Sequence, residues 1–490
     1  MNTADLGLSY LIKLSRMTDA DPSASTTEQT LDQSIAGAVV GGLPAAITDL
    51  GRLVRIPSVS WPAFDPAHVA ESADAVAGLL RDTGVFDRVE VKQAQKAGFP
   101  DGELGHPAVL ATRAAKNGRP TVLLYAHHDV QPPGDEASWQ TKPFEPTVVG
   151  DRLYGRGAAD DKAGVVSHVA AIRALAETVP ADELELGLAV FIEGEEEHGS
   201  HSFVNFLEDN REALAADAIV VADSDNWDTE TPNLTVALRG ACAFNLTVST
   251  LGHASHSGMW GGAAPDAMLA TIKLLSTLWD ENGSVAVAGL TSHDAETPPF
   301  DEAELAASAA FVDGVRAIGT GSVLSRLWFQ PSITVTGIDA PSIANASNTL
   351  VPSVTVRISM RVAPGQTSDD ARDALLAHLT AHAPFGARLD FHDFEGGDPF
   401  LVDANGWAAQ AAKQAMTDAW GTPPVEAGIG GSIPFIADLV RVFPDAQILV
   451  TGVEDPDTRA HSPNESLHLG VFKRAILTEA LLLARLNQRS

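Results

Sequence analysis

Cysteine is almost absent from this sequence of 490 residues, because Cys242 is the only one. A single cysteine cannot form an intrachain disulfide, and it cannot build a cysteine-rich zinc finger or an iron–sulfur cluster. Proteins of reducing compartments commonly show this composition, so we expect a cytoplasmic location.

Basic residues and long apolar runs are also scarce. The chain has 32 Lys and Arg against 64 Asp and Glu, and the resulting net charge of −32 disfavours nucleic acid and anionic membranes as partners. The N-terminus lacks a basic leader and a small-residue cleavage site, so we expect no signal peptide. We find no run that approaches the roughly 18 to 20 apolar residues of a membrane span. Residues 1–32 are expected to form a loose leader, and a helix is expected over 42–55.

Buried strands alternate with helices up to about residue 225. Strand-length apolar runs occupy 121–126, 184–194 and 217–223, and residues 162–177 carry apolar side chains at helical spacing. Strands buried on both faces and separated by helices predict an α/β domain with a mainly parallel sheet flanked by helices.

The pattern changes after residue 240 and returns after 397. Strand, helix, strand, strand, helix, strand is a ferredoxin-like order, and the expected elements are 241–252, 265–279, 332–339, 354–364, 367–383 and 387–394. Segment 281–330 is irregular. We therefore predict an α/β domain in two parts, 1–238 and 397–490, interrupted by an inserted α+β domain over 239–396.

Histidine and acidic residues stand where the predicted strands end. The run 121–126 leads directly into His127, His128 and Asp129, at the end of a parallel strand where α/β sheets bind ligands. Because side chains alternate along a strand, His127 and Asp129 share one face. His127 can then ligate a metal while Asp129 orients its ring.

Other chain segments add similar residues. Any one of these residues alone could be a helix N-cap, part of a solvated acidic loop or a hydrogen-bonded residue at a strand end. Together they suggest a common site. The candidates are Asp160 and Asp161, the acids Glu193, Glu195, Glu196 and Glu197, the pair Asp223 and Asp225, and His461. Nitrogen and oxygen ligands without cysteine suit Zn²⁺, Mn²⁺ or Co²⁺. Five or more candidates exceed one tetrahedral ion, which implies two metals and a bridging carboxylate.

Six motifs in one order carry a family resemblance over roughly residues 40–485. They are YAHHDVQPP, GRGAADDKAG, IEGEEEHGS, the stretch from Asp223 to LRG, HSGMWGG and AHSPNE. This set resembles the co-catalytic di-zinc metallopeptidases that include carnosinases, cytosolic non-specific dipeptidases, aminoacylases and acetylornithine deacetylases. The resemblance implies a catalytic α/β domain and an inserted lid and dimerisation domain.

The resemblance also implies the metal ligands. It makes His127 a ligand, Asp129 its partner and Asp160 the bridge between the metals. Family spacing selects Asp223 over Asp225 as a further ligand, and His461 matches the C-terminal ligand. One ion is then held by His127, Asp160 and Asp223, and the other by Asp160, Glu197 and His461.

Catalytic and substrate-binding roles follow from the same motifs. The resemblance makes Glu196 the general base, Glu197 a ligand and Glu195 a solvated neighbour. His256 matches a histidine that stabilises the oxyanion, often in the active site of the partner subunit, so a homodimer is implied. Arg361 and the Gly431–Ser432 turn match family residues that bind the substrate carboxylate, so we expect them to bind it here.

The implied activity is that of a metal-dependent dipeptidase acting on dipeptides with a free C-terminal carboxylate. A water bridging two ions, most simply Zn²⁺, attacks the peptide bond. Asp223 and the length of the insert favour this activity over an N-acyl amino-acid deacylase of the acetylornithine deacetylase type. A catalytically inactive binding scaffold is a further alternative, but such a protein is expected to lose ligands, and here all are present. The preferred dipeptide, β-alanyl peptides included, is left open.

Overall fold

The computed structural model describes residues 26–100, 102–295, 297–430 and 434–489. These fall into two compact units. The first unit comprises Met1–Leu234, Asp403–Val425 and Leu439–Ser490, and the second comprises Thr235–Val402 and Glu426–Asp438. The segment Glu426–Asp438, assigned from the sequence to the α/β domain, therefore groups with the second unit.

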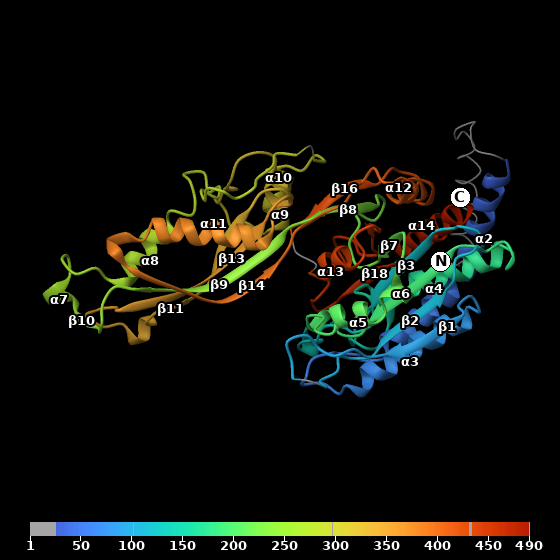
Figure 1. The fold of residues 1–490 in the computed structure, drawn as a ribbon, viewed down its shortest axis with the longest axis horizontal. Coiled ribbons are helices and arrows are strands. Elements are labelled where there is room, and N and C mark those ends of the chain that lie inside the picture. Colours follow the sequence, from blue (N-terminus) through green and yellow to red (C-terminus); the bar gives the residue numbers. More distant parts are fainter. Residues whose placement is uncertain (1–25, 101, 296, 431–433, 490) are drawn as a thin grey trace. The chain divides into compact units, whose positions relative to one another are not determined.

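A twisted sheet with a parallel centre forms the core of the first unit (Figure 1). In spatial order it begins with β1 (Arg88–Lys92), β2 (Ala108–Arg113), β6 (Gly187–Glu193), β3 (Thr121–His127), β7 (Ala218–Val221) and β17 (Gln447–Val450). It continues through β8 (Asn233–Leu238) and β15 (Phe400–Leu401), and β16 (Val425–Ile429) also pairs with β8. The pairs β6–β3, β3–β7 and β7–β17 are parallel, whereas β1–β2 and β2–β6 are antiparallel. Parallel neighbours bring the carboxyl ends of β3, β6 and β7 to one edge, which is where the candidate ligands follow.

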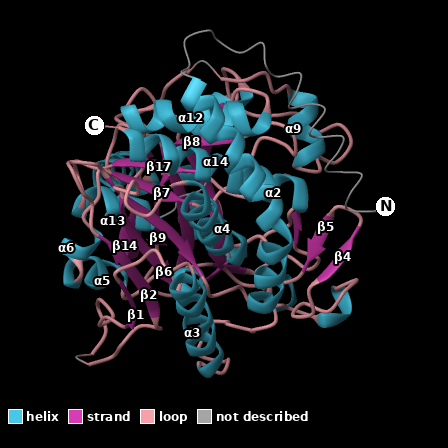
Figure 2. Ribbon diagram, turned by 90° about the vertical axis from the view of Figure 1, so that its right-hand side faces the viewer, coloured by secondary structure: helices cyan, strands magenta, loops and turns pink. Residues whose placement is uncertain are grey.

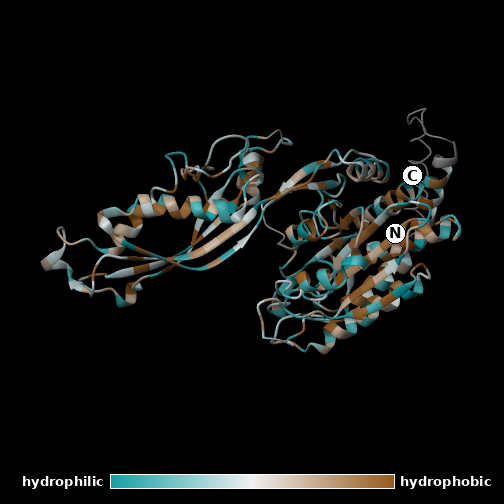
Figure 3. Cartoon of the chain, in the orientation of Figure 1, coloured by the Kyte–Doolittle hydropathy of each residue, from teal (hydrophilic) through white to brown (hydrophobic). Residues whose placement is uncertain are grey.

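The central strands are buried along almost their whole length. Every residue of β6 and β7 is buried, and so is all of β3 except Thr121. Figure 3 shows these strands as mainly hydrophobic. Continuous apolar runs are typical of parallel strands covered on both faces, and this explains why the sequence pattern identified them.

Helices α2 (Thr26–Val54), α4 (Lys162–Thr178) and α14 (Leu469–Gln488) pack against one another (Figure 2). Helix α4 is the one predicted over 162–177. The other helices of this unit are α3 (Ala67–Asp82), α5 (Phe203–Asp209), α6 (Arg211–Leu214) and α12 (Trp407–Trp420). A small sheet joins β4 (Thr147–Val149), β5 (Arg152–Tyr154) and β18 (Ser466–His468).

Helix α2 corrects two expectations. The loose leader was expected to reach residue 32, but the helix begins at Thr26, since Leu31, Ile35 and Val39 recur every four residues and Ile35 and Val39 are buried. Residues 1–25 lie outside the described part. No apolar run of membrane-spanning length was expected, but the span Thr30–Val54 is long and apolar enough to cross a membrane. In its most apolar stretch of 18 residues, 44% of the residues are buried inside the protein. A core helix passes the same test, and this one packs on α4 and α14.

The second unit has the predicted strand and helix order. Its four-stranded antiparallel sheet runs β11–β13–β9–β14, which is the spatial order of a ferredoxin-like split βαβ fold. The elements in chain order are β9 (Gly240–Ser249), α8 (Ala267–Leu275), β11 (Ser332–Asp339), β13 (Ser353–Val362), α11 (Ser368–Ala381) and β14 (Arg388–Gly397).

Alternation along the strands builds the core of this unit. In β9, Cys242, Phe244, Leu246 and Val248 are buried, while the residues between them are only partly buried. These side chains share one core with buried residues of α8 and α11. One covered and one open face is the arrangement that the alternating pattern predicted.

Shorter elements complete the second unit. Segment 281–330 contains two short helices, α9 (Glu302–Ser308) and α10 (Val323–Trp328), and is otherwise irregular, as expected. A two-stranded sheet joins β10 (Ser255–His256) to β12 (Thr349–Leu350), and helix α7 (Ser257–Trp260) follows β10. Helix α13 (Pro434–Val442) is divided between the two units at Asp438.

The first prediction concerns the core of the second unit. Leu246→Ala leaves a cavity beneath α8 and α11 and should lower the free energy of unfolding by about 2 to 5 kcal/mol, measured by urea denaturation. The control Ile338→Ala alters a side chain that is 53% exposed and should change stability by less than about 0.5 kcal/mol. Equal losses in the two variants would contradict this assignment of the core.

Candidate metal centre

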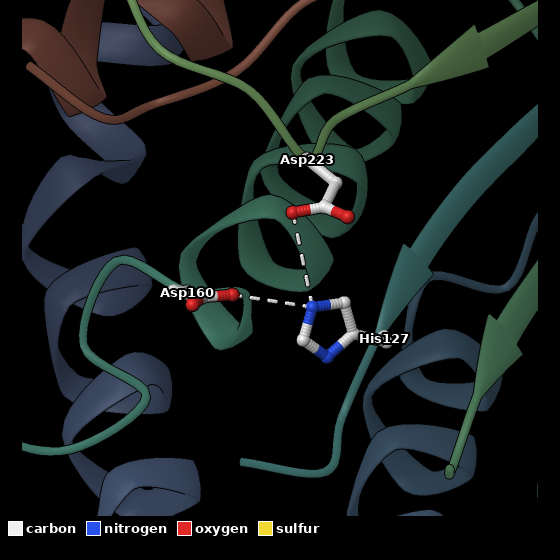
Figure 4. Close-up of side chains that lie close together, drawn as sticks. All are labelled: His127, Asp160 and Asp223. Carbon is white, nitrogen blue, oxygen red and sulfur yellow. Dashed lines mark ion pairs between the residues drawn. The ribbon is translucent and has the colours of Figure 1, made fainter. Parts of the chain in front are cut away.

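His127 ends strand β3 with its imidazole ring directed at two carboxylates from other parts of the chain (Figure 4). Its Nε2 atom lies 3.2 Å from Asp160 Oδ1 and 3.8 Å from Asp223 Oδ1. Asp223 follows β7, the parallel neighbour of β3, and Asp160 precedes helix α4. One ligand atom from each residue lies within 4.8 Å of the other two, which makes this trio a possible metal site.

Asp160 belongs to a second trio through its other oxygen. Asp160 Oδ2 lies 3.0 Å from His461 Nε2, and Glu197 Oε2 lies 3.2 Å from the same nitrogen. Asp160, Glu197 and His461 also offer ligand atoms within 4.8 Å of one another. The carboxylate of Asp160 therefore faces a different histidine with each oxygen, as a bridge between two ions requires.

Asp129 fixes the relative positions of β3 and the loop after β6. Its fully buried carboxylate accepts hydrogen bonds from the backbone N–H groups of Glu196 and Glu197, both at 3.1 Å, and from Ser60 Oγ at 2.7 Å. His127 Nδ1 lies 3.4 Å from Asp129 Oδ1 and 3.2 Å from the backbone oxygen of Asp129. This contact holds the ring so that Nε2 faces the other carboxylates.

Glu465 supports the loop that carries Asp160. This buried side chain accepts hydrogen bonds from the backbone N–H groups of Gly157, Ala159 and Asp160 at 3.0 to 3.2 Å, and it pairs with buried Arg156 at 2.5 Å. Glu465 is the last residue of the AHSPNE motif, and no role was predicted for it from the sequence. Its partners lie about three hundred residues earlier in the chain, so spacing carried no signal for the contact.

The neighbouring acids have other contacts. Asp161 caps helix α4 by accepting from Gly164 N at 3.2 Å, and its other oxygen accepts from His127 N at 3.1 Å. Asp225 is in neither trio, and its backbone forms a β-bridge with Glu454. Geometry therefore separates Asp160 from Asp161 and Asp223 from Asp225.

The three consecutive glutamates divide their tasks in space. Glu197 belongs to the second trio, and Gln131 N also donates to its carboxylate at 3.0 Å. Glu196 Oε2 lies 4.0 Å from His127 Nε2, on the rim of the first trio. The expectation of a solvated Glu195 is wrong: the residue is 2% exposed, and its carboxylate accepts from the backbone N–H groups of His106 and Ser202.

Electrostatics show that the cluster attracts positive charge. Burial raises the pKa of Glu197 to about 7 and raises the pKa of Glu196 well above its usual value. Burial opposes ionisation of Asp160 too, but the imidazole rings of His127 and His461 beside it lower its pKa. Hydrogen bonds to Asp160 and Glu197 raise the pKa of His461 to about 11. Converging carboxylates are stable as anions only when cations or protons neutralise them.

The donor set fits a pair of divalent cations. His127 Nε2 is buried and has no hydrogen-bond partner, although it faces two carboxylate oxygens. A metal ion is the partner that such an orphaned nitrogen accepts, because neutral imidazole and carboxylate are both ligands. All the ligand atoms are nitrogen or oxygen, which suits Zn²⁺, Mn²⁺ or Co²⁺. Their role as ligands stays a prediction.

The residues predicted to contact the substrate lie either in the second unit or outside the described residues. His256 ends β10 and is exposed, and its Nδ1 accepts a hydrogen bond from Gly258 N at 3.1 Å. Arg361 lies in β13, opposite Ala241 on one side and Ser332 on the other. Gly431 and Ser432 lie outside the described residues.

Comparison with known proteins gives the family. Residues 123–485, which contain every predicted metal ligand, match the family described as "Peptidase family M20/M25/M40". The chain belongs to this family. The resemblance found in the motifs is thereby confirmed, and as an M20 peptidase the protein is a hydrolase.

Relatives of this M20 peptidase cover most of its length. The cysteinylglycine-S-conjugate dipeptidase of Corynebacterium striatum is 34% identical over 380 residues, 76% of this chain and 83% of the relative. The Cys-Gly metallodipeptidase dug1 of Schizosaccharomyces pombe is 30% identical over 449 residues, 88% and 93% of the two chains. The crystal structure of human carnosine dipeptidase 1 matches with a TM-score of 0.70 at 23% identity, over 94% of this chain and 99% of that one. The predicted fold class is confirmed.

The second prediction uses the two neighbouring aspartates of the M20 peptidase. Asp223→Asn should reduce bound metal from about two ions to about one per chain, because it removes a ligand of the first trio only. Elemental analysis of the purified protein measures this ratio. The matched control Asp225→Asn should keep both ions, and the reverse result would show that the wrong aspartate has been chosen.

Proposed function

We propose that this M20 peptidase is a metal-dependent dipeptidase that hydrolyses the peptide bond of dipeptides with a free C-terminal carboxylate. The observation that carries the proposal is the shared carboxylate of Asp160, which faces His127 through one oxygen and His461 through the other. Two adjacent cation sites are the arrangement used by hydrolases that activate water. The relatives named as dipeptidases favour peptides over N-acyl amino acids as substrates.

The two trios are proposed to hold the ions, most simply Zn²⁺. His127, Asp160 and Asp223 would hold one ion, and Asp160, Glu197 and His461 would hold the other. When bound, two divalent ions supply a water of lowered pKa and polarise the substrate carbonyl.

Glu196 is proposed to move the proton. Its backbone N–H is held by Asp129 at 3.1 Å, and its carboxylate lies 4.0 Å from His127 Nε2 without belonging to either trio. A carboxylate beside the ligands and not occupied by them can take a proton from the attacking water and then deliver it to the leaving amine. No covalent intermediate is needed.

His256 is proposed to stabilise the developing oxyanion. Because its Nδ1 accepts the bond from Gly258 N, the proton of the neutral ring sits on Nε2, and an N–H donor is what an oxyanion requires. The adjacent helix α7 exposes Met259 and Trp260, which are 71% and 54% accessible. Exposed apolar groups of this size support a homodimer in which this part of the second unit is covered.

Arg361, Gly431 and Ser432 are proposed to bind the substrate carboxylate. A guanidinium group can bind a carboxylate with two parallel hydrogen bonds, which selects for a free C-terminus. The second unit would then act as the lid and dimerisation domain. The single cysteine supports a cytoplasmic location, and the net charge of −32 disfavours nucleic acid and anionic membranes as partners.

The third prediction tests the general base. Wild-type protein loaded with Zn²⁺ or Mn²⁺ should hydrolyse dipeptides and leave N-acyl amino acids intact, as followed by amine release. Glu196→Gln should lower kcat on dipeptides by about 10² to 10⁴-fold, because a neutral amide cannot accept the proton. Its metal content should equal that of wild type. Cleavage of N-acyl amino acids in place of dipeptides would instead support a deacylase.

The fourth prediction tests the dimer. A mixture of His256→Ala and Glu196→Ala chains, refolded together, should recover about one quarter of wild-type activity, because mixed dimers contain one complete site if His256 acts across a two-fold interface. Each variant refolded alone should be inactive. A mixture as inactive as its components would show that His256 does not act across the interface.

A further inference from the structure

Glu197, a predicted ligand of the second trio, has both carboxylate oxygens bonded to one residue, Gln131. The backbone N–H of Gln131 donates to Glu197 Oε1 at 3.0 Å, and the side-chain amide Nε2 of Gln131 donates to Glu197 Oε2 at 2.5 Å. The same Oε2 atom lies 3.2 Å from His461 Nε2. Among the described residues, no other group forms a hydrogen bond or ion pair with this carboxylate. None of the roles proposed above involves the side chain of Gln131.

The segment around Gln131 is constrained before any ion binds. Val130 pairs with Val59 in a parallel β-bridge, and two prolines follow Gln131. A residue before proline is restricted to extended backbone, because the proline ring collides with it in the helical region. The oxygen of the second proline accepts a hydrogen bond from Trp139 Nε1 at 2.8 Å. Since little conformational freedom is left to lose here, Gln131 presents both donors to Glu197 in advance.

His461 is the least constrained residue of the second trio. Its side chain is 59% exposed, whereas those of Asp160 and Glu197 are 7% and 2% exposed. Its loop has positive φ angles at Arg459, His461 and Asn464, a conformation that residues other than glycine rarely adopt. An exposed ligand on such a loop contributes little preorganisation to a metal site. A second ion site therefore depends on the correct placement of Glu197.

The first trio is supported independently of Gln131. The ring of His127 is buried and lies against Asp129, and Asp223 follows strand β7. Among the described residues, Gln131 forms no hydrogen bond with any member of this trio. A change to the side chain of Gln131 therefore acts on Glu197, which belongs to the second trio only.

We infer that Gln131 is a positioning residue that sets the affinity of the second ion site by holding the carboxylate of Glu197. The inference rests on the proposed function, because it takes Asp160, Glu197 and His461 to hold an ion. Without the amide donor, Glu197 can rotate away from the carboxylate of Asp160, which repels it, and an arriving ion must bring the two together. Residues that orient a ligand typically change metal affinity by about 10 to 100-fold when they are replaced.

The fifth prediction measures each ion site by itself, on metal-stripped protein and without any peptide. Asp223→Asn keeps the second trio intact and His461→Ala keeps the first, so each variant reports the Zn²⁺ affinity of one site. Adding Gln131→Met removes the amide donor at similar side-chain volume. Zn²⁺ affinity should then fall by about 10 to 100-fold in the Asp223→Asn chain and by less than about two-fold in the His461→Ala chain. Competition with a chromophoric chelator measures both affinities.

A second measurement uses chains with all of the predicted ligands. At a chelator concentration at which the unaltered chain keeps both ions, Gln131→Met should keep about one, by elemental analysis. The matched control Gln140→Met should keep both, because it changes an exposed glutamine whose side chain forms no hydrogen bond with the described residues.

The outcomes separate this inference from the proposed activity. Equal weakening of the two sites would show that Gln131 acts on the structure as a whole, and an unchanged second site would show that it does not position Glu197. Either result overturns the inference. Selective weakening of the second site in a protein that hydrolyses no dipeptide would refute the proposed activity and leave the role of Gln131 standing.

Discussion

The buried carboxylate of Asp129 is the contact on which the candidate centre depends. It lies two residues beyond the end of β3, and it accepts hydrogen bonds from the backbone N–H groups of Glu196 and Glu197 beyond the end of β6. It also lies next to the Nδ1 side of His127. One anion thereby sets the orientation of a predicted ligand ring and the position of a predicted base and ligand. A buried carboxylate is stable in this role because strong donors surround its oxygens.

A second buried anion performs the same task for the bridging residue. Glu465 gathers backbone N–H groups from the turn before Asp160, and Arg156 neutralises its charge. Breaking such a pair leaves an uncompensated buried charge, which costs about 3 to 5 kcal/mol. The loop is therefore held rigidly enough for both oxygens of Asp160 to face defined partners, as a shared ligand must.

Much of the fold followed from local pattern. The buried runs that became β3, β6 and β7, and the alternation that became β9 and β13, are direct consequences of where each strand meets the core. The start of α2 was missed because a polar stretch before residue 32 concealed its four-residue apolar period. The place of Glu426–Asp438 depends on which unit it contacts, and no local pattern carries that information.

The sequence by itself determined the chemistry of the candidate centre. Strand ends at His127 and Asp223, together with six ordered motifs, identified the family and named the residues that the structure brings into two trios. Only the tertiary structure decided that Glu195 is buried and that Glu465 supports Asp160. The physical reason is that strand and helix periods fix the face and the end of an element. Hydrogen bonds and cavities arise between side chains that meet only when distant segments pack.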